Sequence, residues 1–214
     1  MSAHRYTKAI KYILDVVLGI SLLVALLPFL AVIGITIKLN SPGPIFFKQQ
    51  RVGLFGNLFT IYKFRTMVDD AVNIGAGLNI LDNDPRITSI GKFLREWSLD
   101  ELPQLINIAK GQMSFIGPRP TLKHQVDNYS QHQRKRLNMK PGITGWAQVN
   151  GRNNLTWEER IEMDIWYIDN WSLLLDTKIF LKTFKVILTK DSIYNDRGMN
   201  YDFRGTSNSS DNEK

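Results

Sequence analysis

The sequence contains no cysteine, which excludes disulfide bonds and thiolate metal sites. Its three histidines, His4, His124 and His132, show no spacing typical of metal ligands. No internal repeat is visible, and the 214 residues suffice for one domain with a short appendage. Acidic residues are outnumbered, 20 against 27 basic ones, and the resulting net charge of +7 favours anionic partners such as nucleic acid, acidic lipid or phosphorylated substrates.

Charge is also missing from a long stretch near the N-terminus, residues 16–37, which reads VVLGISLLVALLPFLAVIGITI. A helix of this length spans about 33 Å, close to the hydrocarbon thickness of a bilayer. No small-residue cleavage pattern follows it, which argues against a signal peptide. A transmembrane anchor is the simplest interpretation.

Two details favour a different course through the membrane. Pro28 lies inside the stretch, where it removes a backbone hydrogen bond and predicts a bend. Basic residues flank the stretch on both sides, and the positive-inside rule places such flanks in the cytoplasm; they are Arg5, Lys8, Lys11, Lys38, Lys48 and Arg51. We therefore expect residues 1–40 to form a Pro-broken, re-entrant membrane helix, with a simple span as the alternative.

Beyond the helix stop at Ser41-Pro42-Gly43-Pro44, the sequence predicts a domain over residues 41–200 and a disordered tail over 201–214. The runs IFFKQQRV and LFTIYKF, separated by residues 53–57, predict a β-hairpin. Basic residues on or beside it are either solvated charges or phosphate ligands: Lys48, Arg51, Lys63 and Arg65. The expected fold class is α+β and mostly helical.

An adjacent carboxylate pair, Asp100 and Glu101, stands at a predicted helix start that Ser98 or Asp100 would cap. Exposed N–H groups and the positive end of the helix dipole suit a phosphate or its metal ion. Acidic residues are common at helix starts for stability alone, so the pair by itself does not define a site. The same helix is followed by an arginine between two prolines, Pro118-Arg119-Pro120.

The second half of the chain is predicted to be helical. Residues 121–140 are interpreted as a basic helix with a solvated or membrane-facing surface, and Arg152 in a later turn is a candidate phosphate ligand. Thr156 is expected to cap a helix that ends near Trp171. Residues 172–190 predict an amphipathic helix, which either packs on the core or lies in the membrane interface.

Four ordered segments resemble the bacterial sugar transferase family, monotopic phosphoglycosyl transferases that act on polyprenol phosphate. The segments are YKFRTM (62–67), NDPRITSIGKFLR (83–95), SLDELPQLINIAKGQMSFIGPRP (98–120) and KPGITGWAQVNGRN (140–153). The resemblance covers about residues 5 to 200, and the chain looks like the family's minimal catalytic core. It also implies a re-entrant helix broken at a proline, although the serine that often precedes this proline is Leu27 here.

The resemblance implies transfer of a sugar-1-phosphate from a UDP-sugar to undecaprenyl phosphate, with release of UMP, on the cytoplasmic face of the inner membrane. This reaction would be the first membrane step of a surface glycan or glycoconjugate pathway. Asp100 would be the nucleophile of a ping-pong mechanism with a covalent aspartyl-phosphosugar intermediate, and Mg²⁺ would bind at Asp100 and Glu101. The phosphate-binding residues would be Arg95, Arg119 and Arg152, together with Lys63 and Arg65.

Two other functions remain as alternatives. A membrane-attached glycosyltransferase would move only the sugar and release UDP. A non-enzymatic basic module would bind anionic lipid or nucleic acid, but it leaves the Asp-Glu pair unexplained and the chain shows no nucleic-acid-binding motif. We therefore expect a UDP-sugar, undecaprenyl phosphate and anionic membrane lipid as partners and no nucleic acid. The sugar, the pathway and a homodimer are left open.

Overall fold

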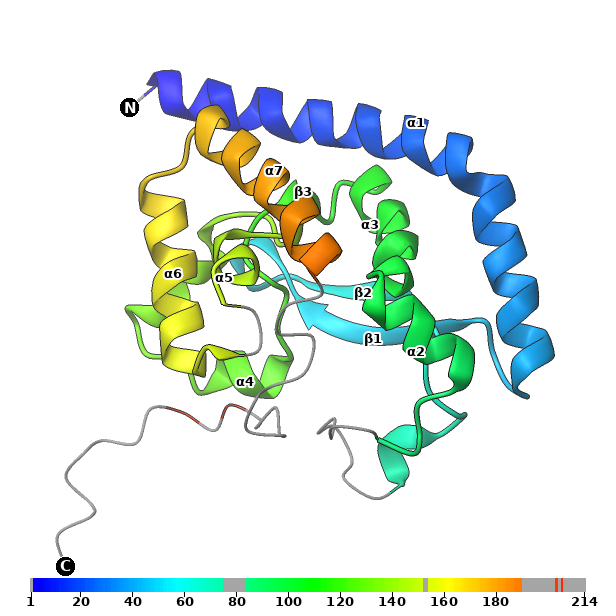
Figure 1. The fold of residues 1–214 in the computed structure, drawn as a ribbon. Coiled ribbons are helices and arrows are strands. Elements are labelled where there is room, and N and C mark those ends of the chain that lie inside the picture. The colour runs from blue at the N-terminus through cyan, green and yellow to red at the C-terminus, as the bar shows by residue number, and fades with distance from the viewer. Residues whose placement is uncertain (1, 75–83, 152–153, 190–202, 204, 206–214) are drawn as a thin grey trace, which may run out of the picture.

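The longest element is α1, Ser2–Asn40, which runs along one side of the molecule (Figure 1). The structure is a computed structural model that describes residues 2–74, 84–151, 154–189, 203 and 205. Further helices are α2 (Ser89–Glu96), α3 (Leu105–Ala109), α4 (Lys123–Asp127), α5 (Trp146–Val149), α6 (Trp157–Asp169) and α7 (Leu173–Thr189).

The helix α1 continues through Pro28 and ends at Asn40, before the predicted stop. Its ribbon bends in the half that contains this proline (Figure 1). The expected bend therefore lies within one continuous helix, because a proline removes one hydrogen bond and leaves the neighbouring ones in place. The re-entrant course stays a prediction. Among the described residues, Tyr6–Asn40 is the one helical segment long and apolar enough to cross a membrane, by length and composition only.

One side of α1 packs on the rest of the chain. Gly19 allows α3 to approach, since a Cβ at this position would lie 2.7 Å from Cγ2 of Ile108. Further along, Ile33 and Ile37 of α1 form a buried cluster with Phe64 and Leu94. Other side chains of α1 remain exposed, among them Ile13, Val17, Val24, Leu27, Val32 and Ile35.

The predicted hairpin is present as β1 (Phe46–Val52) and β2 (Leu58–Phe64), which pair in antiparallel register. Phe47 lies opposite Lys63 and Arg51 opposite Phe59, so these side chains share one face. A second, parallel pair was not predicted: β3 (Ser114–Ile116) with β4 (Gly142–Thr144).

Threonine side chains cap two helix starts, and the cap at Thr156 is the predicted one. The Thr88 side chain accepts a hydrogen bond from the Gly91 amide at the start of α2. Thr156 and Glu159 form a reciprocal capping box at the start of α6. The prediction of one basic helix over residues 121–140 is wrong, because the chain forms the short helix α4 and a separate 3₁₀ turn, Gln133–Asn138.

A buried polar cluster joins α1 to α7. Lys11 Nζ lies 2.8 Å from Oδ2 of Asp176 and 3.5 Å from Oδ2 of Asp15. The Tyr167 hydroxyl of α6 donates to Oδ1 of Asp176 at 2.6 Å, and Ser114 Oγ donates to Asp15 at 2.6 Å. Because a buried charge is stable only with partners, this cluster fixes the N-terminal part of α1 on the domain.

Most of the predicted tail, 201–214, lies outside the described residues. Phe203 is described and buried, with its ring centroid 5.6 Å from that of Tyr129 and 5.8 Å from that of Trp157. At this residue the chain therefore packs on the domain.

Candidate active site

Asp100 and Glu101 lie in the 3₁₀ turn Leu99–Gln104, which leads directly into α3. Ser98 precedes the turn in the left-handed region, with φ of 54°, and its side chain makes no capping hydrogen bond. The predicted α-helical start capped by Ser98 is therefore wrong, although both carboxylates do stand in the first turn of helical backbone. The α-helix itself begins at Leu105.

Glu101 is held by two cations on a single oxygen. Its Oε1 atom lies 2.7 Å from Lys63 Nζ and 2.9 Å from Nη2 of Arg119. The side chain of Glu101 is 14% exposed and that of Lys63 is 18% exposed. Burial alone would raise the pKa of Glu101, but Arg119 and Lys63 outweigh it and hold the pKa below its usual value. Glu101 is thus a fixed carboxylate.

Asp100 is the less stabilised carboxylate of the pair. Burial raises its pKa to about 6, against the opposing charge of Lys63 and with the negative charge of Glu101 adding to the rise. Within the described part of the chain, its side chain makes no hydrogen bond or salt bridge. Neighbouring carboxyl groups with pKa values shifted in opposite directions are typical of catalytic sites.

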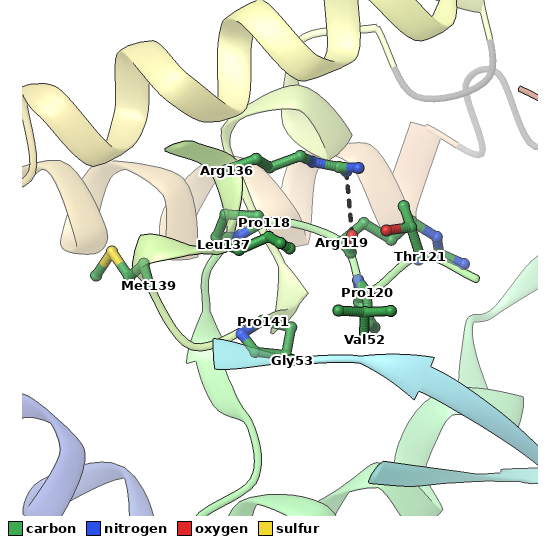
Figure 2. A pocket seen from close by; sticks show the side chains of 10 residues that line it. All are labelled: Val52, Gly53, Pro118, Arg119, Pro120, Thr121, Arg136, Leu137, Met139 and Pro141. Carbon is green, nitrogen blue, oxygen red and sulfur yellow. Dashed lines mark hydrogen bonds between the residues drawn. The ribbon is translucent and has the colours of Figure 1, made fainter. Parts of the chain in front are cut away.

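The turn that carries Arg119 is fixed through its backbone. Figure 2 shows Arg136 directed at the Arg119 carbonyl, to which its Nη2 atom donates at 3.1 Å. The neighbouring carbonyls are also bound: Pro118 accepts from the Gly142 amide at 2.9 Å, Pro120 from Arg51 at 3.4 Å and Thr121 from the Val52 amide at 2.9 Å. The Arg119 side chain stays half exposed and can reach a ligand.

Arg136 is a residue whose role the sequence did not reveal, since it was assigned to a solvated or membrane-facing surface. It is buried, and its Nε atom donates to Oδ2 of Asp164 at 2.7 Å. Its Nη1 atom donates to the Tyr129 hydroxyl at 2.6 Å. Its partner Asp164 is 28 residues away on another helix, so no local sequence pattern could have identified the pair.

Two more arginines lie near Arg119: Arg51, which the sequence left open as a solvated charge or a phosphate ligand, and Arg160, which was not a candidate. Burial, together with the positive charge of Arg119, lowers the pKa of each to about 10. Arg95 also acts on Asp100, lowering its pKa, while its Nε atom donates to Thr66 at 2.8 Å. Positive charge around the carboxylate pair thus exceeds the negative charge, which favours an anionic ligand.

Not every predicted phosphate ligand belongs to this site. Arg65 is buried, and its two terminal nitrogens donate to the carbonyls of Ser41, at 2.8 Å, and Pro42. These contacts make it a support of the loop after α1. Arg152 lies outside the described residues. The structure therefore brings together Lys63, Arg95, Arg119, Asp100 and Glu101.

The carboxylate pair fits a hard divalent cation. Mg²⁺ is commonly bound through one or two carboxylates together with substrate phosphates and water, rather than by a full protein cage. The described residues contain no group of three or more histidine, aspartate or glutamate side chains that could hold a metal. Glu101 Oε2 and the Asp100 carboxylate accept no hydrogen bond within the described ranges, so both can face a cation.

Comparison with known proteins identifies the same family as the motifs. The family model described as Bacterial sugar transferase matches residues 6–190. A similar protein is the "Uncharacterized sugar transferase EpsL" of Bacillus subtilis (strain 168), 48% identical over 157 residues, which are 73% of this chain and 76% of that protein.

Two further relatives have names that state an activity. The "Undecaprenyl-phosphate galactose phosphotransferase" of Salmonella typhimurium is 38% identical over 206 residues, 90% of this chain and 43% of that protein. The "UDP-glucose:undecaprenyl-phosphate glucose-1-phosphate transferase" of Escherichia coli (strain K12) is 43% identical over 191 residues, 82% of this chain and 40% of that protein. The chain therefore spans less than half the length of these two relatives.

Proposed function

The chain belongs to the bacterial sugar transferase family, and from this premise we propose that it transfers a sugar-1-phosphate from a UDP-sugar to undecaprenyl phosphate, releasing UMP. The observation that carries the proposal is the pair of carboxylates, Asp100 and Glu101, facing Lys63 and Arg119. Chemistry on a diphosphate needs a nucleophile and positive charge together, and this arrangement supplies both.

The reaction proceeds in two steps. A carboxylate oxygen of Asp100 attacks the phosphorus that carries the sugar, and the bond from this phosphorus to the bridging oxygen breaks, so that UMP leaves with that oxygen. An oxygen of undecaprenyl phosphate then attacks the same phosphorus, and the Asp100 carboxylate leaves. Dividing one difficult transfer between two displacements lowers the barrier of each. We call the first displacement the donor half-reaction.

The cationic side chains offset the charge repulsion between a carboxylate and an anionic diphosphate. Arg119 can offer a planar pair of N–H donors to phosphate oxygens, and the hydrogen bonds on its turn hold it in place. Lys63 and Glu101 keep each other ionised beside the nucleophile. A Mg²⁺ ion bound by Asp100, Glu101 and the diphosphate would neutralise further charge.

The exposed apolar side of α1 supports a membrane location, which we propose to be the cytoplasmic face of the bacterial inner membrane. On this proposal α1 enters and leaves one leaflet, a course that the basic residues on both flanks favour. The helix α7 exposes large apolar side chains that would rest in the interface; they are Leu173, Leu174, Phe180, Leu181, Phe184 and Leu188.

The product, a polyprenyl-diphospho-sugar, would begin the assembly of a surface glycan or glycoconjugate. The names of the relatives state galactose in one case and glucose in another, so the sugar has to be measured for this chain.

Nucleotide release tests the proposal. The purified protein in detergent micelles is given a panel of UDP-sugars and Mg²⁺, with and without undecaprenyl phosphate. We expect UMP to be released with one or a few donors, continuously only when the lipid is present, and to be lost in Asp100→Asn. The exposed substitution Asp127→Asn, which removes the same charge elsewhere, serves as the control.

The product distinguishes this function from the two alternatives. UDP in place of UMP would identify a glycosyltransferase that moves only the sugar. No nucleotide release with any donor, together with vesicle binding that Asp100→Asn leaves unchanged, would identify a non-catalytic membrane module.

A further inference from the structure

A groove lies where α1 ends and β1 begins. Its volume is about 380 Å³, and it is lined by Lys38, Gly43, Pro44, Ile45, Phe46 and Lys48. The floor is apolar and the two charged groups on the lining are both ammonium groups. A ligand that combines an anionic head with an apolar chain would match both parts.

The two lysines are available to a ligand. Lys38 Nζ donates to the Gly43 carbonyl at 3.0 Å, which leaves two of its three N–H donors. Lys48 is exposed, and its Nζ lies 5.9 Å from the centre of the Tyr62 ring. Neither lysine forms a salt bridge with a carboxylate in the described part of the chain.

The groove is built on fixed backbone. Arg65 binds the carbonyls of Ser41 and Pro42 with its side chain, and its amide donates to the Ile45 carbonyl at 2.9 Å. Gly34 lets α1 lie close to the floor, since a Cβ there would be 3.2 Å from Cγ2 of Ile45. A shape fixed in this way needs little reorganisation when a ligand binds.

The groove and the carboxylate pair are connected through β2 and a shared buried cluster. Lys63, which contacts Glu101, and Arg65, which holds the groove loop, are two residues apart in extended chain, or about 6–7 Å. Ile45 of the groove floor and Leu99, the residue before Asp100, pack against the same buried cluster. One core cluster therefore supports the groove and the turn that carries the nucleophile.

On its other side the groove is continuous with the exposed apolar surface of α1. Ile35 and Leu39, which flank Lys38 in the last turns of the helix, are 59% and 83% exposed. If α1 lies in a membrane, a lipid chain can remain among these side chains while its head enters the groove.

We propose that this groove is the docking site of the acceptor, with the phosphate of polyprenyl phosphate between Lys38 and Lys48 and the first isoprenoid unit on Pro44, Ile45 and Phe46. This inference rests on the proposed function. A phosphate monoester carries close to two negative charges at neutral pH, which two ammonium groups match, whereas the phosphodiester of an ordinary acidic phospholipid carries one.

Steady-state kinetics with the double variant Lys38→Gln/Lys48→Gln test the proposal. The assay uses neutral detergent micelles with no anionic phospholipid, so that undecaprenyl phosphate is the one lipid phosphate. We expect the KM for undecaprenyl phosphate to rise about tenfold, as for the loss of about 1.4 kcal/mol of binding. The KM for the UDP-sugar and the rate of the donor half-reaction, measured as the single burst of UMP without acceptor, stay unchanged.

Two matched variants control for charge and for structure. Lys135→Gln removes the same charge from an exposed position outside the groove and is expected to leave the acceptor KM unchanged. Lys48→Arg keeps the charge and is expected to retain most of the affinity. Because Lys38 and Lys48 are both exposed, the double variant should unfold at the same temperature as the wild type.

The remaining outcomes overturn the proposal in distinguishable ways. An unchanged acceptor KM, with weaker binding to vesicles that contain phosphatidylglycerol, would mean that the groove takes bulk anionic lipid. A slower donor half-reaction would assign the lysines to the first step. Failure of the proposed function itself would appear in the wild type, as the absence of UMP release, and not in the variant alone.

Discussion

Lys63 and Glu101 are 38 residues apart in the sequence, yet the lysine ammonium lies 2.7 Å from the glutamate carboxylate. The contact connects β2 to the turn that carries Asp100 and gives the two neighbouring carboxylates different environments. Glu101 is held ionised, whereas burial raises the pKa of Asp100 to about 6. One carboxylate is thereby suited to hold charge in place and the other to react.

The pKa of Asp100 predicts how the donor half-reaction depends on pH. A protonated carboxyl is a poor nucleophile, so the rate should be half-maximal at a pH of about 6, level off roughly one pH unit above this and fall below it. Because a bound cation favours the carboxylate, raising the Mg²⁺ concentration should move the midpoint to lower pH. The UMP burst, measured from acid to neutral pH at two Mg²⁺ concentrations, checks this. A rate that is flat a full pH unit below 6 would contradict it.

The Lys63–Glu101 contact should contribute measurably to stability. In a double-mutant cycle of Lys63→Met and Glu101→Gln, we expect a coupling free energy of about 1–3 kcal/mol. Glu101→Gln leaves the largely buried Lys63 without its carboxylate, whereas Lys63→Met removes one of the two cations that hold Glu101. Denaturant unfolding in micelles measures it. The exposed pair Lys123–Asp127, at 2.7 Å, is the control and should give less than about 0.5 kcal/mol. Equal coupling free energies for the two pairs would show that the Lys63–Glu101 contact stabilises the fold no more than an exposed pair does.

Arg136 should affect both the stability of the fold and the KM for the UDP-sugar. Arg136→Met leaves the fully buried Asp164 without its counter-charge and should lower the free energy of unfolding by about 3–5 kcal/mol. In Arg136→Met/Asp164→Leu much of this loss should be recovered, while the Arg119 carbonyl still lacks its side-chain donor. We then expect a higher KM for the UDP-sugar in a folded protein. A double variant with wild-type kinetics would show that Arg136 is structural only.

The reaction should require a divalent cation. Excess chelator is expected to stop UMP release, and added Mg²⁺ to restore it, because the carboxylates and the diphosphate otherwise repel one another. The unfolding temperature, measured in the same samples, separates loss of the cation from loss of the fold. Turnover that persists undiminished in chelator would remove Mg²⁺ from the proposal.

The absence of cysteine makes the topology directly testable, since any introduced cysteine is the only one in the chain. Ala3→Cys and Ser209→Cys should both be labelled by an impermeant maleimide only after the cytoplasmic side is opened. Labelling of Ala3→Cys from the periplasmic side alone would show that α1 spans the membrane.

Much of the local structure could be predicted from short-range chemistry. The end of α1 before Ser41, the hairpin around residues 53–57 and the caps at Thr88 and Thr156 each depend on residues close in sequence. The 3₁₀ turn at Asp100 could not be predicted in this way, because an acidic pair beside a proline also fits the start of an α-helix.

The side chains that sequence analysis misplaced all have distant partners. Arg136 is buried because Asp164 lies on α6, and Arg65 is directed at carbonyls 23 and 24 residues earlier in the chain. Lys63 was assigned to phosphate binding through the family resemblance, and this role stays a prediction; its contact with Glu101 required the fold. Charge in the sequence thus identified the kind of residue, and tertiary packing decided which of these residues meet the carboxylate pair.

The buried Lys11 has a consequence for how this protein can be engineered. Its ammonium group lies between Asp15 and Asp176, and Asp176 also accepts a hydrogen bond from Tyr167. The helix α1 is therefore fixed to α7 at one end, and it packs on α3 through Gly19 further along. In the proposed membrane location, the depth of α1 in the bilayer and the height of Asp100 above the bilayer would therefore change together. We expect an unrelated hydrophobic helix in place of α1 to bind the membrane but to hold the proposed nucleophile, Asp100, at a different height above it.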